Sequence, residues 1–216
     1  YQYTAPRLSL GVNLYYMKYK DQLVPTGMVN DGSDALNTNV SDSYRRGVEL
    51  SASWRATGWF TVGANATFSQ NRIENYVDAL KDSPTYGKEL GDMTIAYSPD
   101  VIANAFLNFH HRGFEAVFHT QHVGKQYFTN NENDALSLDA YCVTNLNLAY
   151  TFRTRSARSV RLGLLINNLF NAEYESNGYG YSYMDTWSGP APVRIDEAYY
   201  FPQAPLNVLA NVTVKF

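Results

Sequence analysis

Hydrophobic and polar residues alternate along much of the chain with a period of two, which is the period of a β-strand. The clearest run covers residues 60–69, where Phe60, Val62, Ala64, Ala66 and Phe68 alternate with Thr61, Gly63, Asn65, Thr67 and Ser69. The last segment repeats the pattern, with Leu206, Val208, Ala210, Val212, Val214 and Phe216 on one side. Each of these strands should therefore have one apolar and one polar face.

Six further segments show the same alternation with varying clarity. They cover residues 8–14, 47–54, 101–109, 114–121, 145–152 and 160–167. No segment has the spacing of an amphipathic helix, and all eight prolines fall outside the strands or at their ends, where no ladder hydrogen bond is lost. The pattern predicts eight strands and an all-β fold.

The connections between these strands alternate in length. Short turns are predicted around Ala56–Gly58, His110–Gly113 and Arg153–Ser159, whereas the other four connections are long. Outer-membrane barrels have this arrangement, with short periplasmic turns and long extracellular loops. We therefore expect a transmembrane antiparallel up-and-down β-barrel.

Composition agrees with a barrel. The chain has 18 Tyr and 11 Phe, yet its mean hydropathy is −0.35. Alternate residues facing lipid and a wet lumen, together with polar loops and interfacial aromatic rings, produce this combination. No run approaches the ~20 apolar residues of a transmembrane helix, whereas a barrel strand needs only ~9–11 residues. The net charge of −3 argues against a nucleic-acid partner.

The two faces can be tested by substitution. The face opposite the apolar one is dominated by Gly, Ser, Thr and Asn, which suits a wet lumen or a plug surface in a wide barrel. Val62→Arg should cost roughly 2–4 kcal/mol if residue 62 lies near the bilayer midplane. Asn65→Arg should cost far less.

The last residues have a pattern of their own. Val212, Val214 and Phe216 alternate with polar residues, and the order of turns places Phe216 at the periplasmic edge. This ending resembles the terminal-strand signal that the barrel assembly machinery reads; the alternative is an ordinary edge strand that ends in Phe. The first residue is Tyr1 rather than Met, so we expect a fragment or a processed product.

Several short blocks resemble the C-terminal half of TonB-dependent receptors, particularly those of the Bacteroidetes type. They are YRRGVE at 44–49, VGKQY at 123–127, LDAY at 138–141, NNLFNAEY at 167–174 and YFPQAP at 200–205. The order and spacing of these blocks are specific to that resemblance.

The resemblance implies a plugged barrel of about 22 strands, of which residues 1–216 supply about the last eight. The plug domain and the earlier strands would be absent. The implied function is TonB-energised uptake of a scarce nutrient (an iron chelate, haem, cobalamin, a glycan or a peptide) across the outer membrane of a Gram-negative bacterium. Implied partners are the lipid bilayer, the barrel assembly machinery, TonB through the absent plug, an extracellular small ligand and a surface lipoprotein.

Two other functions remain open at this stage. One is a self-contained eight-stranded structural or adhesive outer-membrane barrel, and the other is a fragment whose interest lies in barrel assembly. We expect no enzyme and no cofactor, because no catalytic cluster and no strained nucleophile turn is visible.

The long connection from Glu173 to Gln203 is the best candidate for ligand contact. It is rich in aromatic residues, which bind ligands at low entropic cost because they are rigid and have a polar tip. The candidate ligand-binding residues are Tyr179, Tyr181, Tyr183, Trp187 and Arg194. The alternative is that these rings pack the loop on itself or form the upper aromatic belt.

The chain shows no convincing metal site. Four histidines are candidates, namely His110, His111, His119 and His122, but neighbouring members point to opposite faces of a strand. Asp31, Asp34 and Asp42 share a predicted loop and could hold calcium, although a solvated acidic loop is the preferred interpretation. The single cysteine, Cys142, is expected to be a small filler on a strand.

Overall fold

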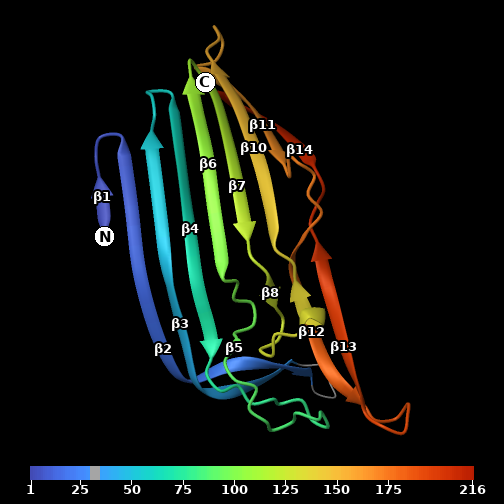
Figure 1. Cartoon of the computed structure of the whole chain (residues 1–216). Helices are drawn as coiled ribbons and strands as arrows, with labels where there is room; N and C mark the ends of the chain where they lie inside the picture. Colours follow the sequence, from blue (N-terminus) through green and yellow to red (C-terminus); the bar gives the residue numbers. More distant parts are fainter. Residues whose placement is uncertain (30–34) are drawn as a thin grey trace.

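The computed structural model describes residues 1–29 and 35–216, and most of them form antiparallel β-strands (Figure 1). The main sheet pairs, in order, β1 (Gln2–Thr4), β2 (Leu8–Val29), β3 (Ala35–Arg55), β4 (Phe60–Ile73), β6 (Val101–His111), β7 (Phe114–Val123), β10 (Tyr141–Phe152), β11 (Ser159–Asn167) and β14 (Asn207–Lys215). The short strand β5 (Met93–Thr94) extends it beside β4. Among the described residues, no helix is long and apolar enough to cross a membrane.

Two small sheets lie beyond one end of the main sheet. One pairs β8 (Gln126–Tyr127) with β9 (Ser137–Leu138), next to the 3-10 turn η1 (Asp134–Leu136). The other pairs β12 (Glu175–Asp185) with β13 (Val193–Pro202) in a long hairpin.

All eight predicted strands are present, but three predictions about the connections were wrong. Residues 15–46 mostly continue β2 and β3 rather than forming a loop, and residues 173–203 contain the hairpin β12–β13. His110 and His111 belong to β6, whose turn is only Arg112 and Gly113. The missed strands lie beyond the main part of the sheet, where no single face is uniformly apolar and alternation is confined to short runs.

The pairing register unites the apolar positions of neighbouring strands on one face. Paired residues of an antiparallel sheet share a face. One row across the strands is Leu10, Ala52, Ala64, Ala105, Thr120 and Thr144, and the next is Leu8, Trp54, Val62, Leu107, Phe118, Leu146, Ile166 and Val208. An adjacent row on the opposite face is Gly11, Ser51, Asn65, Asn104, Gln121 and Val143. The predicted separation of polarity is confirmed for most positions, with Thr120 and Thr144 in the apolar row and Val143 in the polar row as exceptions.

No layer formed by residues 1–29 and 35–216 covers the apolar face of the sheet. Leu14 is 73% exposed and Val212 is 65% exposed, and other large apolar side chains of the same face are also exposed. A soluble monomer does not expose an apolar surface that extends over a whole sheet. Lipid is the solvent in which this face is stable.

Aromatic rings gather on the apolar face near the short turns. The Trp59 and Phe109 rings lie 5.1 Å apart, and the Phe109 and Phe114 rings lie 6.0 Å apart. Tyr16 and Tyr44 form a stacked pair towards the other end of the sheet, with centroids 6.3 Å apart. Such girdles mark the two interfaces of a membrane-spanning barrel.

All long connections lie at one end of the main sheet, and they pack together there (Figure 1). We call this packed region the loop layer; it comprises the described residues of 18–43, 73–98, 124–140 and 173–203. It holds both hydrophobic clusters of the described chain. The first consists of Val24, Val40, Ile73, Tyr76 and Ile95, and the second of Phe128, Leu136 and Leu138. The loop layer is therefore a folded cap and not a set of independent loops.

Candidate functional site

The hairpin β12–β13 has two different faces. Tyr179 pairs with Tyr199 and Tyr181 pairs with Glu197, so these four side chains share one face. The other face carries Gly178 and Gly180, where an added Cβ would lie 2.8–2.9 Å from the Phe128 ring. Because both positions are glycine, the hairpin can approach the Phe128 ring closely. This contact packs the hairpin against the segment 124–140 of the loop layer.

A cavity of about 510 Å³ opens between this hairpin and the far end of the β2–β3 hairpin. Its wall is aromatic and apolar, formed by Pro25, Gly27, Met28, Leu36, Tyr97, Phe128, Tyr179, Gly180, Tyr181 and Tyr199. This volume and lining are typical of a small-molecule pocket. The described residues of the wall carry no charged side chain, so this part of the wall suits a ligand with a broad apolar or ring-shaped surface.

A carboxylate stands beside the aromatic wall. Glu197 accepts hydrogen bonds from the hydroxyls of Tyr181 at 2.6 Å, Tyr199 at 2.8 Å and Tyr183 at 3.3 Å. These bonds hold the pKa of Glu197 below its ordinary value and raise the pKa of Tyr181 and Tyr199. The Tyr179 and Tyr199 rings stack with centroids 5.0 Å apart, so the tyrosines form one rigid surface.

The structure brings some of the predicted ligand-binding residues together and separates others. Tyr179, Tyr181 and Tyr183 lie on the same face, and the first two line the cavity. Trp187 is 80% exposed at the tip of the hairpin. Arg194 pairs across the hairpin with Met184, on the opposite face from the three tyrosines.

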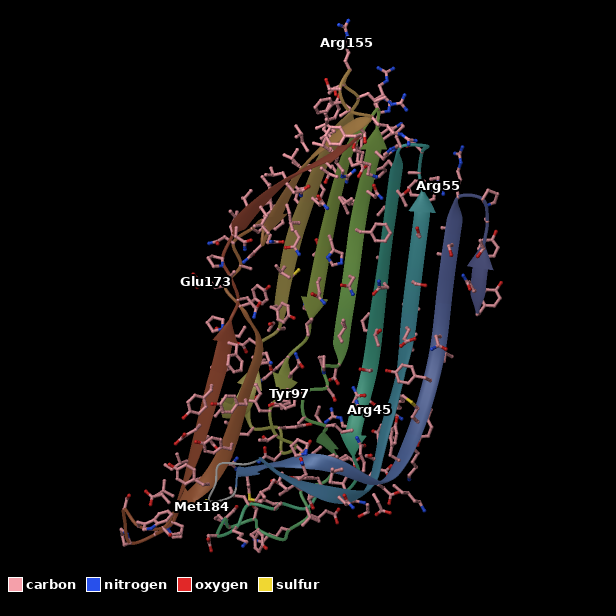
Figure 2. All side chains as sticks on the ribbon, turned by 180° about the vertical axis from the view of Figure 1, so that it is seen from behind. Arg45, Arg55, Tyr97, Arg155, Glu173 and Met184 are labelled. Carbon is pink, nitrogen blue, oxygen red and sulfur yellow. The ribbon has the colours of Figure 1, made fainter. Side chains whose placement is uncertain are left out.

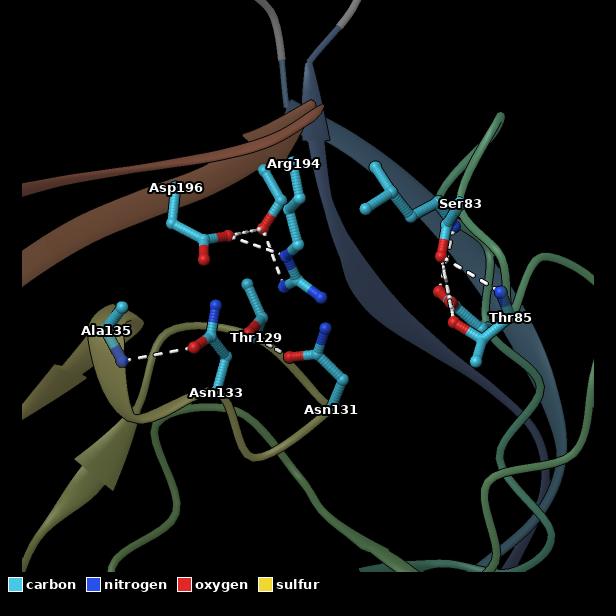
Figure 3. A network of polar contacts seen from close by, with 11 residues as sticks. Ser83, Thr85, Thr129, Asn131, Asn133, Ala135, Arg194 and Asp196 are labelled. Atoms are coloured by element: carbon cyan, nitrogen blue, oxygen red, sulfur yellow. Dashed lines mark hydrogen bonds and ion pairs between the residues drawn. The ribbon is translucent and has the colours of Figure 1, made fainter. Parts of the chain in front are cut away.

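Arg194 is engaged within the protein (Figure 3). Its Nε donates to Asp196 at 2.8 Å and its Nη2 donates to Ser182 at 3.0 Å. Burial would raise the pKa of Asp196, but the hydrogen bonds from Ser182 and Arg194 outweigh it and hold that pKa below its ordinary value. Arg194 therefore stiffens the hairpin, and a ligand that recruited its charge would first have to displace Asp196.

Three side chains fasten the middle of the loop layer. Asn130 accepts from the Ala96 amide at 2.7 Å and donates to the Pro25 carbonyl at 2.6 Å. The Tyr97 hydroxyl donates to the Gly178 carbonyl at 3.3 Å. Glu132 pairs with Arg72 and accepts from the Thr94 amide at 2.9 Å. The cavity wall is thus assembled from segments more than 100 residues apart in the chain.

Sequence reasoning did not indicate Tyr97, Phe128 or Met28, because nothing local marks their contribution to a shared wall. One signal was present for the hairpin: Tyr179, Tyr181 and Tyr183 alternate with Gly and Ser at period two, which is typical of a strand.

The other candidate residues that the structure describes do not form a site. His119 pairs with Phe106 on the polar face, whereas His122 pairs with Ala103 on the apolar face. Within residues 1–29 and 35–216, no group of three or more His, Cys, Asp or Glu is placed to hold a metal ion. Of the three aspartates considered for calcium, Asp31 and Asp34 lie outside the described residues. Cys142 is a free, exposed cysteine in β10.

These features define the class of the protein: a single-layered antiparallel sheet with a lipid-facing side, two aromatic girdles and a folded loop layer is part of the wall of a transmembrane β-barrel. The family model described as TonB dependent receptor-like, beta-barrel matches residues 1–169. The chain belongs to the TonB-dependent receptor β-barrel family.

Solved structures share this fold. The ferric yersiniabactin uptake receptor FyuA from Yersinia pestis is 19% identical, with a TM-score of 0.66 over 100% of this chain and 28% of its own. The copper transporter OprC is 21% identical, with a TM-score of 0.65 over 98% of this chain and 29% of its own. BauA, the ferric preacinetobactin receptor from Acinetobacter baumannii, is 15% identical, with a TM-score of 0.65 over 100% of this chain and 28% of its own. The chain spans less than a third of the length of these proteins.

Proposed function

We propose that residues 1–216 are the C-terminal portion of an outer-membrane receptor for TonB-energised nutrient uptake, and that the aromatic cavity contacts the nutrient. The aromatic cavity at the long-connection end carries this proposal, because it offers a preformed surface where the family's ligands arrive. In this placement the loop layer faces the outside of the cell and the short turns face the periplasm. A plug supplied by the rest of the protein would transmit the pull of TonB.

The open sheet favours this function over a self-contained eight-stranded barrel. Strands β1 and β14 lie at opposite edges of the main sheet, and in the described residues neither pairs with the other. A closed small barrel would need that pairing. The small size of the polar-face residues also leaves room for a plug.

The chemistry of the cavity narrows the nutrient. The described residues of its wall are uncharged, Glu197 accepts a hydrogen bond from the wall residue Tyr181, and Arg194 is already paired. An anionic ligand would meet no free cation among the described residues of this wall. A neutral or cationic nutrient with a planar or ring-shaped surface fits it best, since such surfaces stack on tyrosine.

The remaining partners follow from this placement. Val212, Val214 and Phe216 form the terminal pattern that the barrel assembly machinery would read. The sequence blocks at 44–49 and 167–174 support a receptor of the Bacteroidetes type, for which a surface lipoprotein is a further partner.

Ligand binding can be tested with the full-length protein purified in detergent. A ferric siderophore, haem, cobalamin, a neutral oligosaccharide and a short peptide are titrated while intrinsic fluorescence is recorded. The double substitution Tyr179→Ala and Tyr199→Ala should weaken the best binder about tenfold or more, a loss of about 1.4 kcal/mol. Tyr86→Ala is the matched control, because Tyr86 is an exposed tyrosine of the same layer that lines a different cavity.

Uptake of the best binder should also require TonB. Equal uptake in cells with and without TonB would contradict the proposed function. Equal affinity in the double variant and the parent would leave uptake standing but would refute the cavity as its site.

A further inference from the structure

Acidic residues are concentrated at one end of the main sheet. Among the described residues, every Asp and Glu except Glu49 and Glu115 lies at the long-connection end. The short-turn end instead carries a set of cationic residues, Arg7, Arg55, Arg112, Arg153, Arg155, Arg158 and Lys215, which we call the basic rim. Figure 2 shows Arg55 and Arg155 at this end of the sheet.

The cations of the basic rim have no partner within the described part of the chain. All seven residues are exposed, and none of them forms an ion pair there. Arg161 lies in β11, two residues after the strand begins at Ser159, and it differs from the rim residues. It donates two hydrogen bonds to Glu115, of 2.9 and 2.8 Å. At the opposite end Arg72, Lys125 and Arg194 each have a carboxylate partner. The rim therefore presents a surplus of positive charge to its surroundings.

Part of the basic rim surrounds a cavity of about 780 Å³. It spans the end of the sheet: Phe152 and Phe216 line it on the apolar side, Lys215 lines it with Thr151 and Ser159 on the polar side, and Arg153 and Arg158 line it from the turn. The guanidinium group binds phosphate through paired N–H donors, and two arginines with one lysine offer more donors than a single phosphate needs. The two phenylalanines add an apolar wall beside the cations. Such a combination matches a ligand with an anionic head and a hydrocarbon body.

The basic rim lies at the level of the lipid headgroups, where ligands with an anionic head and a hydrocarbon body are found. Phe152 pairs with Val160, which pairs with Val214, and this row is the last one of the apolar face. The girdle of Trp59, Phe109 and Phe114 lies beside the same short turns. Aromatic girdles sit at the boundary between hydrocarbon and headgroups. Cations placed just beyond that boundary stand among lipid phosphates.

We propose that the basic rim binds the phosphate groups of anionic phospholipids in the leaflet that faces the short turns, and that the cavity at Arg153, Arg158 and Lys215 holds one such headgroup. The leaflet assignment rests on the membrane placement of the proposed function, whereas the headgroup site does not depend on which nutrient is carried. Bound lipid fixes the position of the barrel wall along the membrane normal and neutralises the positive charge of the basic rim. Clustered basic residues beside a membrane recognise anionic lipids in this way.

Native mass spectrometry of the full-length protein tests the headgroup site. The protein is purified in detergent and mixed with equal amounts of dioleoyl-phosphatidylglycerol and dioleoyl-phosphatidylcholine. We expect phosphatidylglycerol to bind preferentially, and the double variant Arg153→Gln and Arg158→Gln to lose that preference by about tenfold or more. Lys81→Gln with Lys88→Gln is the matched control, because it removes two exposed, unpaired lysines of the described chain from the opposite end.

The outcomes separate the proposals. An equal loss in both double variants would show an effect of net charge alone and would overturn the site, as would an unchanged preference in the rim variant. Tighter binding of a polyglutamate peptide than of phosphatidylglycerol would assign the rim to an acidic protein partner instead.

The leaflet is tested by labelling Ser156→Cys in a Cys142→Ala background with a membrane-impermeant maleimide. Labelling only after permeabilisation supports the periplasmic leaflet, and labelling of intact cells overturns it. Neither experiment uses a nutrient or TonB, so failure of the uptake function would leave their results unchanged.

Discussion

A pair of neighbouring arginine substitutions in β4 tests which face of the sheet meets lipid. Ala64 pairs with Ala52 and Ala105 on the apolar face, and Asn65 pairs with Ser51 and Asn104 on the polar face. Both positions are exposed within residues 1–216, so neither arginine meets a packed core formed by this part of the protein. Ala64 is also a better test than Val62, which lies only two residues from the start of β4 at Phe60 and beside the girdle.

The expected magnitudes differ by more than the error of a folding experiment. Arginine on the lipid face costs about 2–4 kcal/mol at the bilayer midplane and about 0–1 kcal/mol near an interface. Ala64→Arg should therefore destabilise the barrel by about 2–4 kcal/mol. Asn65→Arg removes one exposed hydrogen bond, donated by Asn104 at 3.2 Å, and should cost about 1 kcal/mol or less. Val62→Arg should fall between them.

The measurement is a urea titration of the full-length protein in phosphatidylcholine vesicles, with the folded fraction read from gel mobility. A difference of about 2 kcal/mol between Ala64→Arg and Asn65→Arg corresponds to roughly 30-fold in the folding equilibrium. Equal costs at the two positions, or a larger cost for Asn65→Arg, would refute the assignment of faces.

Three further predictions concern the loop layer and the terminus. Burial opposes a low pKa for Glu132, but its bonds to Thr94 and Arg72 prevail, so its stabilising effect is present above the ordinary value of 4.5 and is lost as pH falls through the lowered pKa. The rate of limited proteolysis of the loop layer should rise as pH falls through that acidic range. In the Glu132→Gln variant the rate should depend less steeply on pH than in the parent protein. Glu197→Gln should lower the pKa of Tyr181 towards 10.0, as followed by the ultraviolet absorbance of tyrosinate; an unchanged titration would contradict the hydrogen-bonded cluster. The proposed assembly signal includes Phe216, so Phe216→Ala should reduce the amount of folded receptor recovered in outer membranes, as measured by quantitative blotting.

The main sheet was predictable from the sequence because lipid imposes a strict rule on it. Every second residue from Phe60 to Phe68 faces hydrocarbon and must be apolar. Apolar and polar residues therefore alternate along this segment with a period of two. The lengths of the connections then indicated which end of the sheet carries the short turns and which carries the long connections. The hairpin β12–β13 was mistaken for a loop because no lipid constrains either of its faces.

The sequence by itself determined the strands that span the membrane, their two faces, the order of short and long connections and the aromatic character of the candidate site. These properties are local, since each depends on residues a few positions apart. Only the tertiary structure decided that Tyr97 and Phe128 join Tyr179 and Tyr199 in one wall, that Arg194 turns away to Asp196, and that seven cations meet at one rim. Those outcomes depend on contacts between side chains of segments that are far apart in the sequence. Packing and hydrogen bonding decide which of these contacts form, and neither produces a periodic pattern in the sequence.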